Sequence, residues 1–332
     1  MRIDLRHGGL LDAMKRDFAH APQPWLDLST GINPWPYALG PLHPDSLTHL
    51  PTETAKAQCL GAMAQAWQAK ATSITLIPGS ELIIRLLPNL IAPRRVALTR
   101  PMYSDHERIW RRAGVEIVIA DDPLDAVDDV DLVVICNPNN PDGRAWSRED
   151  LRAARVRLAK RGGFLLLDEA YGDLDEGRSL CPEAGAQGLL ILRSTGKFYG
   201  LAGLRLGAFL APPAIQAALE AYLGFWSVSG PALEAGARLY QDLDWQAQMR
   251  RRLAETCSMM DAALESVGIK AVTGSDLFRY LTLDKAHAVW QHLAEAGIYT
   301  RRFNGDDHHL RLGLCAGADL DRLVQALADR PA

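Results

Sequence analysis

The chain has 332 residues, of which 48% are hydrophobic and 23% are charged. This length predicts two domains around a large core, and the composition excludes intrinsic disorder, collagen-like repeats and a coiled coil. The formal net charge of -4 provides no positive excess for binding a nucleic acid backbone. No apolar stretch is long enough for a membrane span or for the core of a signal peptide, so we expect a soluble, cytoplasmic protein.

Three regions differ in character along the chain. Residues 1–40 are rich in proline, glycine and tryptophan, which predicts an ordered arm that joins the small domain. Residues 41–230 alternate short apolar runs with amphipathic stretches, the pattern of a sheet covered by helices on both faces. Residues 231–332 combine long helical stretches with short strand-like pieces, which indicates a smaller α+β domain. We therefore predict an α/β fold with a large, doubly wound, mostly parallel sheet. Its strand candidates are residues 96–99, 116–119, 132–136, 164–167, 189–192 and 206–210.

The five cysteines are odd in number and widely spaced, so we predict that they are reduced and form no zinc or redox pair. Cys136 ends an apolar run and is interpreted as a buried strand residue. His308 and His309 are adjacent, so their side chains point apart and one metal ion cannot easily bind both. No metal site is predicted.

Polar residues gather where strands of the predicted sheet end, which is where open α/β sheets bind their ligands. An Asn-Pro-rich stretch, 137–143, follows one strand, Asp168 and Tyr171 follow the next, and a further strand leads to Lys197. Each feature alone has a simpler explanation as a turn, a helix cap or a solvated lysine. Together they supply the groups that one phosphorylated aromatic aldehyde, pyridoxal 5′-phosphate, requires.

Each part of this cofactor has a candidate partner. Lys197 lies in a Gly-rich loop and suits a Schiff base with the aldehyde, while Asp168 suits the protonated pyridine nitrogen. Asn140 and Tyr171 are suitable donors to the phenolate oxygen, and Tyr103 is a suitable aromatic lid. The phosphate needs a helix N-terminus, hydroxyls and a guanidinium, for which the candidates are Gly79, Ser80, Glu81 through its backbone N–H, Ser194 and Arg205.

The order of these motifs resembles that of the fold-type I pyridoxal-phosphate enzymes of the class I/II aminotransferase group, over nearly the whole chain. The most specific match is Ser194-x-x-Lys197 followed by Gly-Leu-Ala-Gly-Leu-Arg-Leu-Gly at 200–207. The Asn-Asn-Pro-x-Gly and Asp-Glu-Ala-Tyr pieces, 139–143 and 168–171, occur in the same order. The resemblance implies a homodimeric enzyme with Lys197 as its catalytic residue and the cofactor contacts given above. It also implies that Arg311 holds the substrate carboxylate, although a surface arginine on a strand explains that residue as well.

Two positions depart from the family pattern. Many relatives have a tyrosine before proline after the first helix, and it reaches the cofactor phosphate of the neighbouring subunit. This chain has Leu50 before Pro51, so the hydrogen bond is replaced by His49 or water, or is absent. Asp142 stands where threonine is usual before Gly143, which we interpret as a tolerated change in a turn.

The cofactor alone does not determine the reaction, because any bond to the substrate Cα that stands perpendicular to the ring is weakened. If an arginine holds the carboxylate near the ring plane, transamination follows. If the carboxylate stands upright, carbon dioxide leaves, and Lys197 is the natural acid to reprotonate Cα.

The amino-terminal arm favours decarboxylation. His7-Gly8-Gly9 and residues 25–36 resemble the opening of the cobalamin-biosynthetic threonine-phosphate decarboxylases, a subgroup that also has Leu-Pro at 50–51. This resemblance implies the conversion of L-threonine O-3-phosphate to (R)-1-amino-2-propanol O-2-phosphate. The candidates for binding this substrate are His7, Arg301, Arg302 and Arg311 for the phosphate, with Asn33 nearby. A solvated pair explains Arg301 and Arg302 as well, and an Asn-Pro turn explains Asn33.

Three alternatives remain open at this point. An aminotransferase of a phosphorylated amino acid, such as histidinol phosphate, would have the same fold and cofactor. A non-catalytic effector-binding module is less favoured, because Lys197 is retained and no helix-turn-helix segment is added. A nucleotide-binding oxidoreductase is disfavoured further, because no G-x-G-x-x-G follows the first strand.

Overall fold

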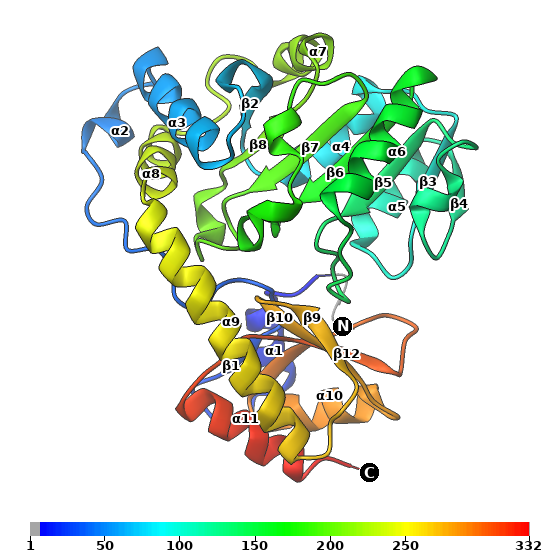
Figure 1. Cartoon of the computed structure of the whole chain (residues 1–332). Coiled ribbons are helices and arrows are strands. Elements are labelled where there is room, and N and C mark those ends of the chain that lie inside the picture. Colours follow the sequence, from blue (N-terminus) through cyan, green and yellow to red (C-terminus); the bar gives the residue numbers. More distant parts are fainter. Residues whose placement is uncertain (1–6, 332) are drawn as a thin grey trace. The chain divides into compact units, whose positions relative to one another are not determined.

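The computed structural model describes residues 7–331, and their contacts divide them into two compact units (Figure 1). The large unit holds residues 35–140 and 144–246. The small unit holds the described residues up to 34, the short stretch 141–143 and residues from 247 onward. Among residues 7–331, none of the helices combines the length and the apolar character needed to span a bilayer.

The large unit is built on a seven-stranded sheet in the order β2-β8-β7-β6-β5-β3-β4. β8 runs antiparallel to both of its neighbours, and all other pairs are parallel. The predicted doubly wound, mostly parallel sheet is therefore confirmed, and β2 is a strand that the prediction omitted. The strands are β2 (Ile74–Ile77), β3 (Arg95–Leu98), β4 (Glu116–Ile119), β5 (Leu132–Cys136), β6 (Phe164–Glu169), β7 (Leu189–Ser194) and β8 (Gly207–Leu210).

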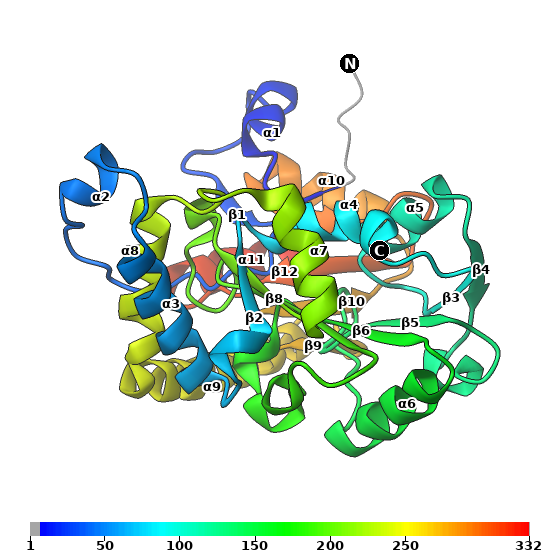
Figure 2. The same ribbon diagram turned by 90° about the horizontal axis from the view of Figure 1, so that it is seen from above.

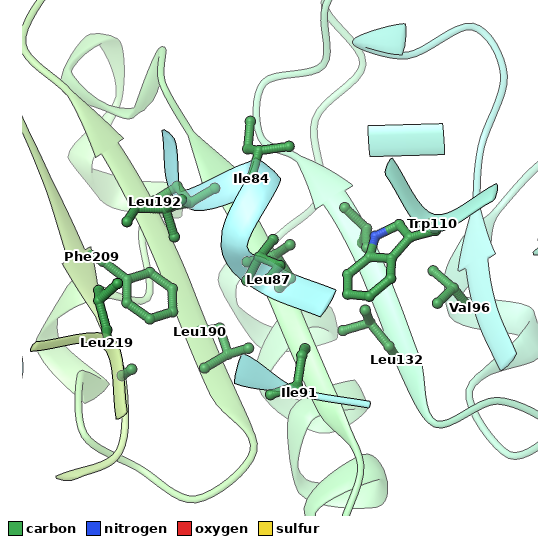
Figure 3. Packing of buried hydrophobic residues seen from close by; sticks show 14 of the residues in the cluster. Ile84, Leu87, Ile91, Val96, Trp110, Leu132, Leu190, Leu192, Phe209 and Leu219 are labelled. Atoms are coloured by element: carbon green, nitrogen blue, oxygen red, sulfur yellow. The ribbon is translucent and has the colours of Figure 1, made fainter. Parts of the chain in front are cut away.

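Helices cover both faces of this sheet. One face packs against α4, α5 and α7 through a core that includes Leu87, Trp110 and Leu219 (Figure 3). Helix α6 lies on the opposite side from α4 and α7 (Figure 2). The helices of the large unit are α2 (Asp45–Thr48), α3 (Glu53–Ala66), α4 (Ser80–Leu90), α5 (Ser104–Arg112), α6 (Arg148–Lys160), α7 (Pro213–Leu223) and α8 (Gly230–Gln241).

The small unit is an α+β arrangement around a five-stranded sheet in the order β1-β11-β12-β10-β9. β1, from the amino-terminal arm, pairs in parallel with β11, and the other pairs are antiparallel. The strands are β1 (Leu26–Leu28), β9 (Val272–Ser275), β10 (Phe278–Thr282), β11 (Ile298–Arg302) and β12 (His309–Gly313), and the helices are α1 (Leu11–Asp17), α10 (Ala286–Glu295), α11 (Ala318–Ala328) and most of α9 (Leu243–Ser266).

The division between the units differs from the expected boundary at residue 230. Helix α8 belongs to the large unit, because it packs closely against α3: a Cβ added at Gly236 would lie 2.6 Å from the Sγ of Cys59. The tip of the Asn-Pro-rich loop, in contrast, belongs to the small unit. Gly143 has a φ of +76°, and a Cβ there would lie 1.8 Å from the carbonyl oxygen of Gly274. These close approaches depend on which helices and loops meet, so the boundary follows from packing.

Candidate active site

All of the predicted cofactor residues except Gly79 line one pocket in the large unit. It has a volume of about 160 Å³ and lies where β5, β6 and β7 end and where α4 begins. Sequence analysis did not assign Ile84, Cys136 and Ala170 to the site. The predicted residues that line the pocket are Ser80, Glu81, Tyr103, Asn140, Asp168, Tyr171, Ser194, Lys197 and Arg205.

Asp168 lies near the end of β6, is 6% exposed and is held by two donors. The backbone N–H of Ala170 donates to its Oδ1 at 3.1 Å, and Nε2 of His106 lies 2.8 Å from its Oδ2. A carboxylate only accepts hydrogen bonds, so this contact places the imidazole proton on Nε2. The two donors fix the direction of the carboxylate while leaving its negative charge available to a cationic ligand.

His106 is a site residue that sequence analysis missed. It lies on α5, is fully buried, and its Nδ1 has no hydrogen-bond partner among residues 7–331. The available signal was a histidine in one of the amphipathic stretches between strands, four residues before Trp110 and three after Tyr103.

The loop that carries Lys197 is anchored on both sides of the lysine, by a hydrogen bond on one side and by ring stacking on the other. The lysine Nζ lies 5.9 Å from the centroid of the Tyr171 ring. Thr195 exchanges a 3.1 Å hydrogen bond with the hydroxyl of Tyr240, and Tyr199 stacks on Trp245 with ring centroids 5.6 Å apart. Because the backbone is held on either side, the amine can move while its attachment point stays in place.

The start of α4 and the guanidinium of Arg205 form an anion-binding cradle. Gly79 precedes α4 with a φ of +87°, and a Cβ at this position would lie 2.6 Å from Nη2 of Arg205. Glycine is therefore required for the guanidinium to approach the helix N-terminus. With the hydroxyls of Ser80 and Ser194, this arrangement has the donors that a phosphate group needs.

Two further pocket residues are positioned by their neighbours. Asn139 donates from Nδ2 to the carbonyl of Pro101 at 2.9 Å, which ties the loop before Asn140 to the segment before Tyr103. Burial, reinforced by the carboxylates of Asp105 and other nearby acids, raises the pKa of the Tyr103 hydroxyl. The Tyr103 ring is therefore neutral and suits contact with another aromatic ring.

Ligand-type atoms of His106, Cys136 and Asp168 lie within 4.8 Å of one another, a grouping that sequence analysis did not foresee. By type these atoms could bind a metal ion. The rest of the pocket offers a lysine amine, hydroxyls and a guanidinium, which suit a phosphorylated aldehyde instead. The donor set fits pyridoxal 5′-phosphate at each of its polar groups.

The small unit brings some of the predicted substrate residues together. Arg311 on β12 is 6% exposed and donates from Nη2 to the carbonyl of Ser29 at 2.9 Å. His7 precedes Gly8, where a Cβ would lie 2.3 Å from the same carbonyl oxygen, so the arm passes beside Arg311. Asn33 is buried in the segment after β1.

Arg301 and Arg302 occupy opposite faces of the sheet in the small unit. Arg301 lies directly across from Arg311 in the β11–β12 pair, so the two guanidinium groups share a face. Arg302 lies on the other face, with its guanidinium 4.5 Å from the Trp290 ring centroid and in contact with His287. Burial lowers the pKa of Arg302. The structure therefore groups Arg301 with Arg311 and separates Arg302 from them.

The fold and the pocket together define a fold-type I pyridoxal-phosphate enzyme. Residues 43–327 match the family model described as aminotransferase class I and II. A threonine-phosphate decarboxylase of Sinorhizobium sp. is 39% identical over 334 residues, covering 99% of both chains, and one of Pseudomonas aeruginosa is 36% identical, covering 94% of this chain and 93% of the relative. The chain belongs to the class I and II aminotransferase family, and pyridoxal 5′-phosphate is its cofactor.

A solved structure shows the same fold. The histidinol-phosphate aminotransferase of Sinorhizobium meliloti, in complex with pyridoxal-5′-phosphate, superimposes with a TM-score of 0.81 at 20% sequence identity, covering 96% of this chain and 93% of that chain.

Proposed function

We propose that this protein decarboxylates L-threonine O-3-phosphate to (R)-1-amino-2-propanol O-2-phosphate for cobalamin biosynthesis. The observation that carries this proposal is the 39% identity to a threonine-phosphate decarboxylase over 99% of both chains, amino-terminal arm included. The grouping of Arg301 with Arg311 supports it, because the substrate carries both a carboxylate and a phosphate.

The pocket residues divide the binding of the cofactor between them. When bound, pyridoxal 5′-phosphate supplies an electron sink that weakens one bond to the substrate Cα. We assign Asp168 to its pyridine nitrogen, where His106 and the N–H of Ala170 hold the carboxylate in place. Tyr103 would cover the ring, and Asn140 and Tyr171 would donate to the phenolate oxygen. The cradle of Gly79, Ser80, the backbone N–H of Glu81, Ser194 and Arg205 would hold the phosphate.

Lys197 is the proposed catalytic residue. Loss of carbon dioxide leaves an electron pair on the substrate Cα, which must then receive a proton. The Nζ of Lys197 lies in the same pocket as Asp168 and Tyr171 and is the group we assign to deliver it. Because the loop is anchored on both sides, the backbone of Lys197 stays in place and its amine stays within reach of the substrate Cα.

The anionic groups of the substrate are assigned to residues of the small unit. For decarboxylation we propose that Arg311 would hold the carboxylate out of the ring plane, and that Arg301 and His7 bind the phosphate, with Asn33 nearby. Arg302, which the sequence also suggested, is instead expected to support the packing of β11 against α10, because its guanidinium lies over Trp290.

A single assay separates this proposal from the aminotransferase alternative. Purified protein is incubated with threonine phosphate, with and without 2-oxoglutarate. We expect release of carbon dioxide without any keto acid. Strict dependence on 2-oxoglutarate would show transamination instead, and a protein whose cofactor spectrum responds to no amine would indicate the effector-binding module.

We also propose that the enzyme is a homodimer. Large apolar side chains are exposed on the large unit, including Leu47, Leu50, Phe225 and Trp226, of which Phe225 is 79% exposed. Two hollows of about 790 and 630 Å³ lie beside them, lined largely by α3, α7 and α8. Large apolar side chains that stay exposed beside hollows are a feature of protein interfaces. Sedimentation velocity of the wild type and of Leu50→Glu tests this: a monomeric wild type would contradict the proposal.

A further inference from the structure

A buried ionic cluster lies on the face of β6 and β7 opposite the cofactor pocket. Leu166 and Leu192 pack in the core beneath α4, so Asp168 and Ser194, two residues further along each strand, point to the same side. Glu169 and Arg193 therefore point to the other side. They are direct partners in the β6–β7 pair and are 1% and 0% exposed.

Arg193 connects two carboxylates within this cluster. Its Nη1 donates to Oε2 of Glu169 at 2.9 Å, and its Nη2 donates to Oδ1 of Asp173. The guanidinium lies 4.8 Å from the centroid of the Trp67 ring, and the indole N–H of Trp67 donates to the same oxygen of Asp173 at 3.1 Å. Glu169 also accepts from the hydroxyl of Ser179 at 2.6 Å. The forked guanidinium thus holds several segments at once, which a lysine ammonium cannot do in the same geometry.

Three of the segments that the cluster holds, those of Glu169, Asp173 and Arg193, carry residues of the cofactor pocket. Glu169 follows Asp168, and Arg193 precedes Ser194. Asp173 belongs to the turn after Tyr171, and this turn passes directly over the guanidinium, because a Cβ at Gly172 would lie 2.5 Å from Nη1 of Arg193.

The cluster also reaches the loop of the catalytic lysine. Trp67 packs edge-on against Tyr240 with ring centroids 5.0 Å apart. The hydroxyl of Tyr240 shares a hydrogen bond with Thr195, two residues before Lys197. Stability alone does not account for this arrangement, because buried ion pairs are often no more stabilising than apolar residues of similar volume.

We propose that Arg193 is a positioning residue of the cofactor site. By bridging Glu169 and Asp173 it sets the register of the β6 and β7 ends and the turn at Tyr171, and so places Asp168, Tyr171 and Ser194 for the cofactor. The inference rests on the cofactor site and not on the substrate proposed above. A cofactor titration therefore tests it whichever amino acid proves to be the substrate.

The test uses Arg193→Lys, which keeps the positive charge but loses the fork. We expect the dissociation constant of pyridoxal 5′-phosphate, measured by titration of the folded apoprotein, to rise about 10- to 100-fold, because the loss of one well-aligned charge-assisted hydrogen bond to the cofactor has an effect of this size. The visible circular dichroism of the bound cofactor should change as well. Arg155→Lys is the matched control, because Arg155 on α6 also forms a partly buried ion pair, with Glu183. The affinity of this variant for the cofactor should stay at the wild-type value.

Urea unfolding of the same variants separates positioning from stability. A lower free energy of unfolding with an unchanged dissociation constant and an unchanged dichroism signal would overturn the proposal. Glu169→Gln provides a second variant that keeps the volume and the Arg193–Asp173 pair, so that the chain still folds. It should weaken cofactor binding in the same direction by a smaller factor, and wild-type affinity in this variant would likewise count against the proposal.

Discussion

The sequence specifies the pocket of the large unit and the sheet face of the small unit that carries Arg301 and Arg311 in different ways. In the pocket, the functional residues follow the strand ends at short, recognisable intervals, such as Ser194-x-x-Lys197. In the small unit, Arg301 and Arg302 are adjacent and identical, and only strand pairing decides which of them faces Arg311. A motif therefore predicts residues at strand ends well, whereas the face of a residue within a strand depends on register.

The largest expected effect is in the pocket. Lys197→Ala removes the amine that binds the cofactor aldehyde and delivers the proton, so turnover should fall by about 10³-fold or more. The visible absorbance of the covalently bound cofactor should also be lost. Lys160→Ala, at an exposed position on α6, is the control and should keep both. Retention of turnover by Lys197→Ala would refute the assignment of the whole pocket.

Asp168→Asn should have the next largest effect. The substitution keeps the shape of the side chain and removes the negative charge that pairs with the pyridine nitrogen. Turnover should fall by about 10²-fold, the usual effect of removing one electrostatic stabiliser. The free energy of unfolding should change little by comparison, and steady-state kinetics together with urea unfolding checks both expectations. Wild-type turnover would contradict the role given to Asp168.

Arg301 and Arg302 of the small unit test whether strand register identifies a substrate-binding residue. Arg301→Gln should raise the KM for threonine phosphate about 10- to 100-fold, because charge-assisted hydrogen bonds contribute about 1.5–3 kcal/mol. Arg302→Gln should raise it less than about threefold and act mainly on stability, since its guanidinium packs on Trp290. The reverse order of effects would show that strand register does not identify the substrate-binding arginine.

His106→Phe should have a smaller effect than the substitutions of Lys197 and Asp168. It removes the hydrogen bond to Asp168 while keeping the ring volume, so kcat should fall about tenfold, within the range for a hydrogen bond to a charged group. His292→Phe is the control, because His292 contacts the carbonyl of Ala326 in the small unit and has no role in the pocket. Equal effects of the two substitutions on kcat would remove His106 from the site.

Several features of the molecule were predictable from the order of residues. The apolar runs identified β3 to β8, because strands covered on both faces need continuous apolar sequence. Residues such as Asp168 and Lys197 could be assigned to one pocket, because the ends of parallel strands meet at one edge of the sheet.

Other features depended on contacts between distant segments. β2 was missed because the polar Thr75 interrupts its apolar run. His106 reaches Asp168 from 62 residues away in the sequence, and helix α8 joins the large unit through the close fit of Gly236 against Cys59. The sequence by itself determined the fold class, the cofactor and most of the residues that line its pocket, because these follow from local periodicity and from chemistry at strand ends. Only the tertiary structure decided the partner of Asp168, the arginine that shares a face with Arg311 and the cluster around Arg193, because register and side-chain packing join residues that no local pattern connects.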